Sequence, residues 1–505
     1  MLSSINPRNG TEIGKTQIVS REEVYKKVAL AREAQKEWGN KPIRERLHHL
    51  RNLCHLLSEK AESFSELIMQ ETGKSLVDAL TGEILPSLFW IDYVCRNSER
   101  LLAPRKISSG FLFSHENVVT FDPLGVVGII TPWNFPVYIT LTSAAAALAA
   151  GNTVVTKPSH LTPLCILKLE EIIEEAEFPP GVFQVIPGDS TTGSALVEAG
   201  IDKIVFTGSV EVGRKIAMEC AERFIPFSLE LGGKDPMIVL EDAPMPRTVH
   251  GALYGGFCHA GQICMSVERI YVAEPIAEKF VQGVVEETAK LQLGKEISPI
   301  QSQEQLLKIQ TQVQEAIERG AILLVGGKRV DSPGNFYPPT ILFDVPENVA
   351  LLKEETFGPV IPIQIVKDEE EAIRLANASS YGLTASVWSR NLERAKKVAE
   401  QLHAGSVYIN DNLTPAANPH APWGGVKESG TGKQRGEWGL YSMVSVRHFG
   451  WNRFLFAKDP FWFPRTKKQE KLALSLIRGL FSRKFQDKLA GLWDALKAFL
   501  SRSSA

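Results

Sequence analysis

Short apolar runs alternate with helical stretches through the middle of the chain. Runs rich in Val and Ile predict buried strands at about 126–130, 153–156, 183–186 and 203–206. Helices are expected between them, at about 140–150 and 163–176, and the alternation resumes beyond Cys264. Repeated strand–helix units build a parallel sheet, and ligands bind at the carboxyl ends of its strands. The pattern therefore predicts an α/β fold.

The pattern differs on the N-terminal side of this region. Residues 21–100 carry apolar positions at helical spacing, with one helix capped by Ser20 and another at about 43–57. Residues 106–122 instead carry Ile, Phe, Val and Thr in a pattern that favours a β-hairpin or arm.

The tail beyond about residue 450 has a pattern of its own. Six aromatic residues lie between 451 and 463, and from Lys467 to Phe499 Leu and Phe recur at helical spacing. Residues 465–505 hold ten Lys or Arg and three Asp or Glu, whereas the chain has a formal net charge of −2. Aromatics beside a cationic amphipathic helix are typical of an interfacial membrane anchor. A membrane span is not expected, because Arg478, Arg483, Lys484 and Lys488 interrupt the helix and Gly479 and Gly491 weaken it. A helix packed on the protein's own surface, or covering a substrate entrance, is the alternative.

The composition of the chain indicates how many domains it can form and which classes of protein it does not resemble. A chain of 505 residues, 44% apolar, can form about three domain-sized units. The small net charge argues against a general nucleic-acid binder. Six scattered cysteines with no close pair favour a reduced setting with free thiols. No signal-peptide pattern or apolar run long enough to span a membrane is present, so a cytoplasmic protein is expected, with peripheral membrane association as a hypothesis for the tail.

Two side chains are candidates for covalent chemistry. Cys264 follows a run of small residues and precedes an apolar strand at 270–273. A thiol is a strong nucleophile when its thiolate is favoured, although a lone apolar cysteine is more often inert packing. Glu230 lies between two leucines and before two glycines. Apolar neighbours raise a carboxyl pKa, which suits a general base, whereas a glutamate paired with a lysine is the alternative.

A candidate phosphate site follows the strand at 203–206. Gly208 lets the backbone approach a ligand, and Ser209 can cap a following helix whose free N–H groups attract phosphate. The spacing is not that of a G-x-G-x-x-G motif, so an ordinary strand–turn–helix junction stays open.

Seven motifs occur in an order that resembles the NAD(P)-dependent aldehyde dehydrogenase superfamily. They are Pro132-Trp133-Asn134, Lys157-Pro158-Ser159, Phe206-Thr207-Gly208-Ser209, Leu229-Glu230-Leu231-Gly232-Gly233, Gly261-Gln262-Ile263-Cys264, Glu355-Thr356-Phe357-Gly358-Pro359 and Pro422-Trp423-Gly424-Gly425. The resemblance covers about residues 5–450. It implies oxidation of an aldehyde to a carboxylic acid with NAD or NADP as the cofactor.

The resemblance also implies roles for matched residues. Cys264 would form a thiohemiacetal and then a thioester, and Glu230 would activate the water that releases the acid. Asn134 and the backbone N–H of Cys264 would form the oxyanion hole. The cofactor-binding residues implied are Trp133, Lys157, Ser159, His160, Gly208, Ser209, Gly213, Leu231, Gly232, Glu355 and Phe357. No metal site is expected, because Cys258 and His259 lack metal-ligand spacing and are interpreted as packing residues.

The resemblance implies a Rossmann-type cofactor domain with a five-stranded sheet (1–104 and 124–232), an α/β catalytic domain (233–435) and β oligomerisation arms (105–123 and 436–450). The amphipathic helical tail (451–505) is predicted from its own pattern and completes the expected fold. The arms indicate a homodimer or homotetramer.

One position departs from the family pattern. NAD-preferring members usually carry an acid three residues after the lysine that ends the second strand, and this chain has His160 there. Without a carboxylate, a ribose 2′-phosphate meets less repulsion, so we expect use of both NAD and NADP. A surface histidine tolerated beside either cofactor is the alternative.

The tail suggests a hydrophobic aldehyde, long-chain or isoprenoid-derived. A small semialdehyde is the competing expectation, because the Ser-Val-Glu-Arg run after Met265 also occurs in succinate-semialdehyde-type relatives. A catalytically silent scaffold is the alternative of another class, and the presence of Cys264, Glu230 and Asn134 argues against it. Glu230 also argues against a coenzyme-A-acylating variant, which needs no acid to activate water.

Overall fold

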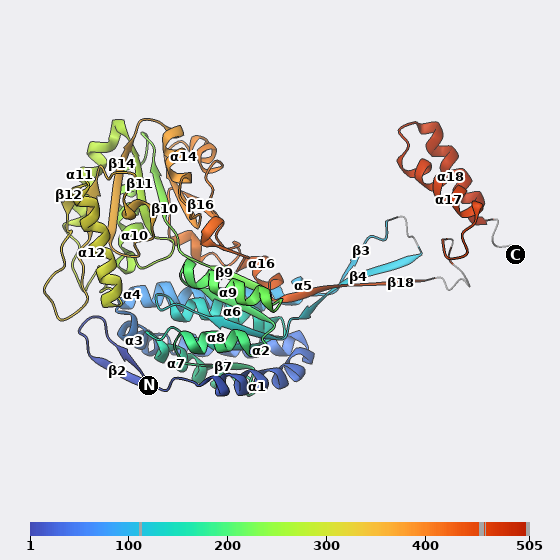
Figure 1. The fold of residues 1–505 in the computed structure, drawn as a ribbon, viewed down its shortest axis with the longest axis horizontal. Coiled ribbons are helices and arrows are strands. Elements are labelled where there is room, and N and C mark those ends of the chain that lie inside the picture. Colours follow the sequence, from blue (N-terminus) through green and yellow to red (C-terminus); the bar gives the residue numbers. More distant parts are fainter. Residues whose placement is uncertain (111–113, 454–458, 460, 501–505) are drawn as a thin grey trace. The chain divides into compact units, whose positions relative to one another are not determined.

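The computed structural model of the protein describes residues 1–110, 114–453, 459 and 461–500. Within this part the chain forms two compact units, one of residues 1–104 and 120–447 and one of residues 105–119 and 448–505. Figure 1 shows that the first unit combines two sheets with helices packed around them.

The first sheet carries the predicted strand–helix alternation. Its strands are β5 (Val126–Ile130), β6 (Thr153–Lys157), β7 (Phe183–Val185), β8 (Lys203–Thr207), β9 (Phe227–Glu230) and β17 (Gly430–Thr431). They are ordered β17-β9-β8-β5-β6-β7, and all pairs except β17–β9 are parallel. Every residue of β5 and β6 is buried, which explains the apolar sequence of β5 and the two valines at the centre of β6.

The expectation of a five-stranded cofactor sheet was incomplete. The sixth strand, β17, is two residues long and pairs Gly430 with Glu230, so it comes from a segment 200 residues later in the chain. So short a strand has no periodicity of its own, because pairing to β9 alone creates it.

Helices pack around this sheet. They are α1 (Arg21–Asn40), α2 (Ile43–Glu59), α3 (Ala61–Thr72), α4 (Leu76–Ala79), the π-helix η1 (Leu80–Ile84), α5 (Leu85–Leu101), α6 (Pro136–Ala149), α7 (Pro163–Glu175), α8 (Ser190–Glu198) and α9 (Val210–Glu222). The predicted helices at 21–100 and 163–176 are confirmed, and Ser20 caps α1. Helix α6 begins at Pro136 rather than at about residue 140, because proline is favoured in the first turn. The N-terminal hairpin of β1 (Leu2–Ile5) and β2 (Glu12–Thr16) had no sequence prediction.

The second sheet has seven strands. They are β10 (Asp235–Val239), β11 (Val267–Ala273), β12 (Ile322–Val325), β13 (Thr340–Phe343), β14 (Val360–Val366), β15 (Thr384–Trp388) and β16 (Ser406–Ile409), ordered β12-β13-β14-β11-β10-β15-β16. Its helices and short turns are α10 (Met245–Phe257), η2 (Cys258–Gly261), η3 (Glu274–Ile276), α11 (Ala277–Thr288), α12 (Gln303–Glu318), α13 (Ala350–Lys353), α14 (Glu369–Asn377), α15 (Leu392–Ala399), η4 (Thr414–Ala417) and η5 (Lys427–Ser429). Helix α16 (Gly436–Tyr441) instead packs against α5 and α6, beside the first sheet. The chain passes from β9 of the first sheet to β10 of the second through residues 231–234.

A three-stranded sheet, ordered β18-β4-β3, includes the predicted arm. Its strands are β3 (Arg105–Ile107), β4 (His115–Pro123) and β18 (Val444–Asn452), and β3 pairs antiparallel with β4. The β-hairpin expected at 106–122 is confirmed, apart from residues 111–113, which lie outside the described residues. The arm expected at 436–450 contains most of β18, although the strand itself begins only at Val444.

The tail forms two helices, α17 (Lys467–Phe481) and α18 (Phe485–Leu500). The helical prediction is confirmed, but the single periodic pattern is interrupted at residues 482–484. Thr466 and Gln469 form a capping box at the start of α17. In the described part of the chain, no helix is both long and apolar enough to cross a membrane. Phe454 and Phe456 of the predicted aromatic cluster, and the side chain of Phe499, lie outside that part.

Candidate active site

Carboxyl ends of parallel strands bring several predicted residues together. In the first sheet Ile130 pairs with Lys157 and with Phe206, and Thr207 pairs with Glu230. The segments after β5, β6, β8 and β9 therefore leave the sheet at one edge. Trp133, Lys157, Gly208 and Glu230 belong to these ends, as expected for a ligand site of an open α/β sheet.

Cys264 lies in a loop whose backbone is held in an unusual path. His259 and Ala260 have φ of 49° and 56°, a region that L-residues rarely adopt. Gly261 has φ of 70°, and a Cβ there would lie 2.1 Å from the carbonyl oxygen of Gly358. The Gln262 side chain accepts from Gln301 N and donates to the carbonyls of His259 and Pro299. These contacts fix the turn that presents Cys264.

Glu230 and Cys264 are brought together by the segment that joins the two sheets. A Cβ on Gly233 would lie 2.3 Å from the carbonyl oxygen of Cys264, so only glycine permits this approach. Ser429 holds the segment from the other side, since its hydroxyl donates to Gly232 O at 2.6 Å and its carbonyl accepts from Leu231 N. The carboxyl group of Glu230 thus lies at a fixed strand end near the thiol.

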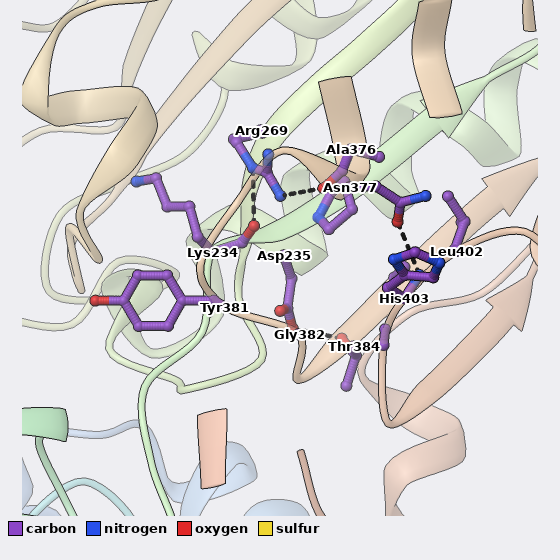
Figure 2. Close-up of a pocket in the computed structure, with 13 residues that line it drawn as sticks. Lys234, Asp235, Arg269, Ala376, Asn377, Tyr381, Gly382, Thr384, Leu402 and His403 are labelled. Carbon is purple, nitrogen blue, oxygen red and sulfur yellow. Dashed lines mark hydrogen bonds between the residues drawn. The ribbon is translucent and has the colours of Figure 1, made fainter. Parts of the chain in front are cut away.

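A buried polar network supports the end of the joining segment. Figure 2 shows Arg269 donating to the carbonyl of Lys234, at 2.8 Å, beside a cavity of about 10 Å³. Arg269 also donates to the carbonyls of Leu375 and Ala376, and Asp235 accepts from Thr384. Lys234 forms a buried ion pair with Glu268. Since these partners come from three elements, the network ties β10 rigidly to its neighbours.

Burial sets the electrostatics of the two candidate catalytic groups. Burial raises the pKa of Glu230 to about 8, opposed by the nearby cations Arg435 and Lys433 and by Trp423. The pKa of the Cys264 thiol is raised far above its usual value. Burial is the largest cause, and the nearby carboxyl groups of Glu355, Asp235 and Glu230 add to it. The thiol form of Cys264 is therefore favoured in this state of the protein, and a nearby base is needed to take its proton.

Asn134 is buried in the turn between β5 and α6. Its side-chain amide donates to the carbonyl oxygen of Gln262 at 3.0 Å, which places it against the Cys264 loop. Lys74 donates to the backbone carbonyl of Asn134. The Lys74 ammonium also forms an ion pair with the Glu83 carboxylate, at 2.6 Å. Glu83 also accepts from the N–H groups of Val137 and Tyr138 at the start of α6. The buried Lys74–Glu83 pair thus supports the turn carrying Asn134.

A cavity of about 390 Å³ opens onto Cys264 and Glu230. Much of its wall is apolar and comes from η1, α5, α6 and the segment around η4. The lining includes Leu85, Phe89, Phe135, Ile139, Ile263, Leu413, Ala416 and Ala417. Polar side chains from Asp78, Tyr138 and Arg435 are interspersed. The arrangement offers a largely apolar chamber beside a thiol and a carboxyl group.

Cys258 and His259 also line this cavity, so the interpretation of both as packing residues was incomplete. The imidazole of His259 lies edge-on to Trp133 and Phe135, with ring centroids 6.5 and 5.8 Å away. Burial holds the pKa of His259 well below its usual value, so the ring is neutral.

The predicted cofactor residues fall into two groups, the first around β6 and β8. Lys157 is buried at the end of β6 and donates to the carbonyls of Pro158 and Gly188. Burial lowers its pKa to about 8. Ser209 caps α9 by accepting from Val212 N, and a Cβ on Gly208 would meet the Phe206 ring at 2.5 Å. The free N–H groups of a 13-residue helix therefore point to this edge.

The second group lies close to Cys264. Glu355 accepts from Gly233 N at 3.0 Å, and burial raises its pKa to about 7. A Cβ on Gly232 would meet the Glu355 carboxylate at 2.7 Å. Phe357 packs edge-on against Trp133, with centroids 5.5 Å apart, and its N–H donates to Glu268. These contacts connect the loop after α13 to the turn after β5.

The remaining predicted residues are placed around these groups. Leu231 is buried and packs against α9 where Gly213 leaves room for it, since a Cβ there would lie 2.6 Å from Leu231. Ser159 accepts from Leu161 N in the turn after β6. His160 lies next to Ser159 and is exposed. The pKa of His160 is lowered mainly by partial desolvation and also by the nearby Lys157 ammonium.

These residues suit a dinucleotide. The N-terminus of α9 and the glycine before it match a pyrophosphate, because both supply backbone N–H groups without a side chain in the way. A buried ammonium at Lys157 and a carboxylate at Glu355 match ribose hydroxyl groups, which accept and donate hydrogen bonds. The donor set therefore fits NAD or NADP.

Several lining residues had no sequence prediction. Phe89 lies on α5, and Tyr138, Ile139 and Thr142 lie on α6. Arg435 comes from the segment before α16, where it donates to the Tyr138 hydroxyl at 3.0 Å and lies 4.8 Å above the Trp423 ring. Its φ of 59° is unusual for arginine, but no local pattern reveals it.

Comparison with known proteins agrees with this geometry. The aldehyde dehydrogenase family model matches residues 1–449. The chain is 35% identical over 473 residues to 4,4'-diapolycopene aldehyde oxidase from Methylomonas sp, covering 92% of this chain and 88% of that protein. It is 35% identical over 451 residues to the succinate-semialdehyde dehydrogenase [NADP(+)] of Escherichia coli, covering 88% and 92%.

Solved structures show the same fold. A crystal structure of an NADP-dependent enzyme from E. coli superposes with a TM-score of 0.87 at 34% identity, covering 89% of this chain and 94% of that one. Betaine aldehyde dehydrogenase from Staphylococcus aureus in complex with NAD+ superposes with a TM-score of 0.87 at 32% identity, covering 92% and 93%. Family match, fold and site chemistry agree, and the chain belongs to the aldehyde dehydrogenase family of NAD(P)-dependent oxidoreductases.

Proposed function

We propose that this enzyme oxidises a hydrophobic aldehyde to its carboxylic acid, with Cys264 as nucleophile and Glu230 as general base. The observation that carries the assignment is the junction at Gly233, which sets the Cys264 loop against the strand end bearing Glu230, beside one shared cavity. A thiol suits the reaction because it attacks a carbonyl well and later leaves well.

The first step joins substrate and protein. The Cys264 sulfur bonds to the aldehyde carbon, while the thiol proton passes to the Glu230 carboxylate. Negative charge develops on the aldehyde oxygen, where the Asn134 amide and the Cys264 N–H would donate; one such donor contributes about 3 kcal/mol. A bound NAD or NADP would supply the hydride acceptor for this adduct. Once the hydride has left, the acyl group would remain on the Cys264 sulfur as a thioester.

The second step releases the acid. Glu230, having lost its proton to solvent, takes a proton from water as the oxygen bonds to the acyl carbon. The carbon–sulfur bond then breaks, and the Cys264 thiolate leaves. A base with a pKa of about 8 holds a proton more strongly than an ordinary glutamate, which favours this transfer.

Lys157, Ser209, Gly208 and Glu355 would hold the cofactor, with Trp133, Ser159, Gly213, Leu231, Gly232 and Phe357 shaping its surroundings. We further propose that both NAD and NADP are used, because His160 replaces the carboxylate that would repel a 2′-phosphate. Comparing kcat/KM for the two cofactors tests this, and a preference for NAD beyond about a thousandfold, equal to about 4 kcal/mol, contradicts it.

The apolar walls of the cavity support a hydrophobic substrate. Phe89, Ile139 and Leu413 offer no hydrogen bonds to a second polar group, and Asp78 on the same wall would repel an anionic one. The diapolycopene aldehyde oxidase among the relatives acts on a long apolar aldehyde by its name, which agrees with this chamber.

One observation favours a semialdehyde instead. Arg435 is buried, lines the cavity and could pair with a substrate carboxylate. Activity with decanal and with succinate semialdehyde distinguishes the two, because the apolar walls favour the first by a higher kcat/KM. The Arg435→Gln variant supports the semialdehyde assignment if KM for succinate semialdehyde alone rises.

The catalytic assignment is tested by Cys264→Ser. We expect reduced-cofactor formation to fall by about three orders of magnitude or more, because a hydroxyl in this buried site is a much poorer nucleophile. Cys258→Ser is the matched control, since Cys258 lines the same cavity and should retain most activity. Equal activity of Cys264→Ser and the unaltered enzyme would refute the assignment.

A further inference from the structure

The two tail helices pack through their smallest side chains. We call α17 and α18 together (467–500) the tail hairpin; Figure 1 shows them lying along each other. Ser475, Gly479, Gly491 and Ala495 are buried. A Cβ on Gly491 would lie 2.4 Å from Gly479 N and 2.6 Å from the Ser475 carbonyl. The two backbones are therefore in direct contact, and the glycines expected to weaken a helix instead make this packing feasible.

The large apolar side chains of the tail hairpin face outward. Phe481 and Phe485 are 78% and 73% exposed, and Trp493 is 59% exposed. The same holds for Leu474, Ile477, Leu480, Leu489, Leu492 and Leu496. A helix pair in water normally buries such residues between its helices. Here the arrangement is inverted, with small residues inside and large ones outside, as in helices packed in lipid, where large residues face the acyl chains.

Cations flank this apolar surface. Lys471 and Arg478 are exposed on α17, and Arg483 and Lys484 are exposed between the helices. Exposed aromatics, Trp462 and Phe463, precede α17, and such rings favour the headgroup level of a bilayer. This combination of apolar and cationic groups matches an acidic phospholipid bilayer, in which anionic headgroups lie over apolar acyl chains.

We propose that the outer face of the tail hairpin binds the surface of an anionic phospholipid bilayer, with both helices lying in the interface. A second copy of the chain is a poorer partner for this face, because two tails of the same positive charge repel each other. The inference is independent of the substrate assignment.

Sedimentation of the full-length enzyme with vesicles tests the proposal. Vesicles of equal parts phosphatidylcholine and phosphatidylglycerol should bind it, and added salt should weaken the binding. In Lys471→Gln/Arg478→Gln the partition coefficient should fall about twenty-five-fold, because each cation near an anionic surface strengthens binding about fivefold. Ile477→Glu/Trp493→Glu should lower it at least as much. Lys279→Gln and Phe224→Glu, exposed positions of the first unit, are matched controls and should bind normally.

Activity with a water-soluble aldehyde should be the same in all variants, which confirms that they are folded. Equal binding by the tail variants and the unaltered enzyme overturns the proposal, as does no binding by the unaltered enzyme. If the enzyme does not bind vesicles, and Ile477→Glu/Trp493→Glu lowers its sedimenting mass without lipid, the face is an interface between copies.

Discussion

Glu230 shows how one buried side chain sets both reactivity and stability. It stands at the end of β9, beside Gly424, whose added Cβ would lie 3.1 Å from its carboxylate. Its pKa is raised because burial opposes its charge more strongly than Arg435 and Lys433 favour it. A base of this kind is protonated at neutral pH more often than an ordinary glutamate.

The Glu230→Gln variant should therefore change how the free energy of unfolding depends on pH. The folded pKa of about 8 lies above the usual value of 4.5, so the folded state binds this proton more tightly than the unfolded state. As pH rises between these two values, the carboxyl group lowers the free energy of unfolding by about 1.4 kcal/mol per pH unit. Above the folded-state pKa it causes no further loss. Replacement should remove that loss, so the variant's free energy of unfolding should exceed that of the unaltered enzyme increasingly from pH 5 to pH 8.

Urea denaturation across this range measures the difference, with turnover measured in parallel. Turnover of the unaltered enzyme should rise with pH through about 8, whereas Glu230→Gln should turn over at least about a hundredfold more slowly, because acyl release loses its base. A stability difference that stays constant with pH would contradict the burial argument.

Among the helices, α6 depends on a buried ion pair for its start. Glu83, in the π-helix η1, accepts from two N–H groups at the N-terminus of α6 and from Lys74. Both side chains of the pair are fully buried. Lys74 also contacts the Phe135 ring, with its ammonium 3.7 Å from the centroid. The pair therefore connects the helical N-terminal segment to the turn carrying Asn134.

Lys74→Met should destabilise the protein by about 3–5 kcal/mol, since it leaves the Glu83 carboxyl buried without its cation. Lys74→Met/Glu83→Gln should recover part of that loss, because the uncompensated charge is gone. Chemical denaturation measures both. Lys36→Met is the control, since its pair with Glu33 is exposed and should contribute less than about 1 kcal/mol. A loss for Lys74→Met no larger than that of the control would show that the pair is not structural.

At the scale of the whole molecule, strand β18 forms an edge of its sheet and pairs with β4 on one side. It is the outer strand of its sheet, and Val446 on it is 62% exposed. Apolar edge strands are rarely left in solvent, because they pair with other strands. We propose that copies of the chain associate through this strand as a homodimer or homotetramer.

Analytical ultracentrifugation should then give a mass of at least twice 55.8 kDa. Val446→Glu should lower the average mass, because a charge on the interface strand would be buried on association. Phe224→Glu, which replaces a side chain 94% exposed away from that strand, should leave it unchanged. A monomeric unaltered enzyme would exclude the proposal.

Local pattern was enough to predict much of this protein. The buried strand at 126–130 is an apolar run and the buried strand at 153–156 has two central valines, because both strands are covered on both sides. Residues at their carboxyl ends meet because the strands are parallel. Seven ordered motifs pointed to the family, since each marks a backbone or side chain that the chemistry needs. The tail's charge and periodicity were visible in the same way.

Features that depend on contacts between distant segments could not be predicted. The pairing of Gly430 with Glu230, the position of Arg435 in the cavity and the Lys74–Glu83 pair each join parts of the chain with no shared periodicity. Gly479 and Gly491 could be interpreted as helix-weakening residues until the folded chain placed them in contact. Spacing along a chain reports which face of an element is apolar, but which other segment meets that face follows from three-dimensional packing.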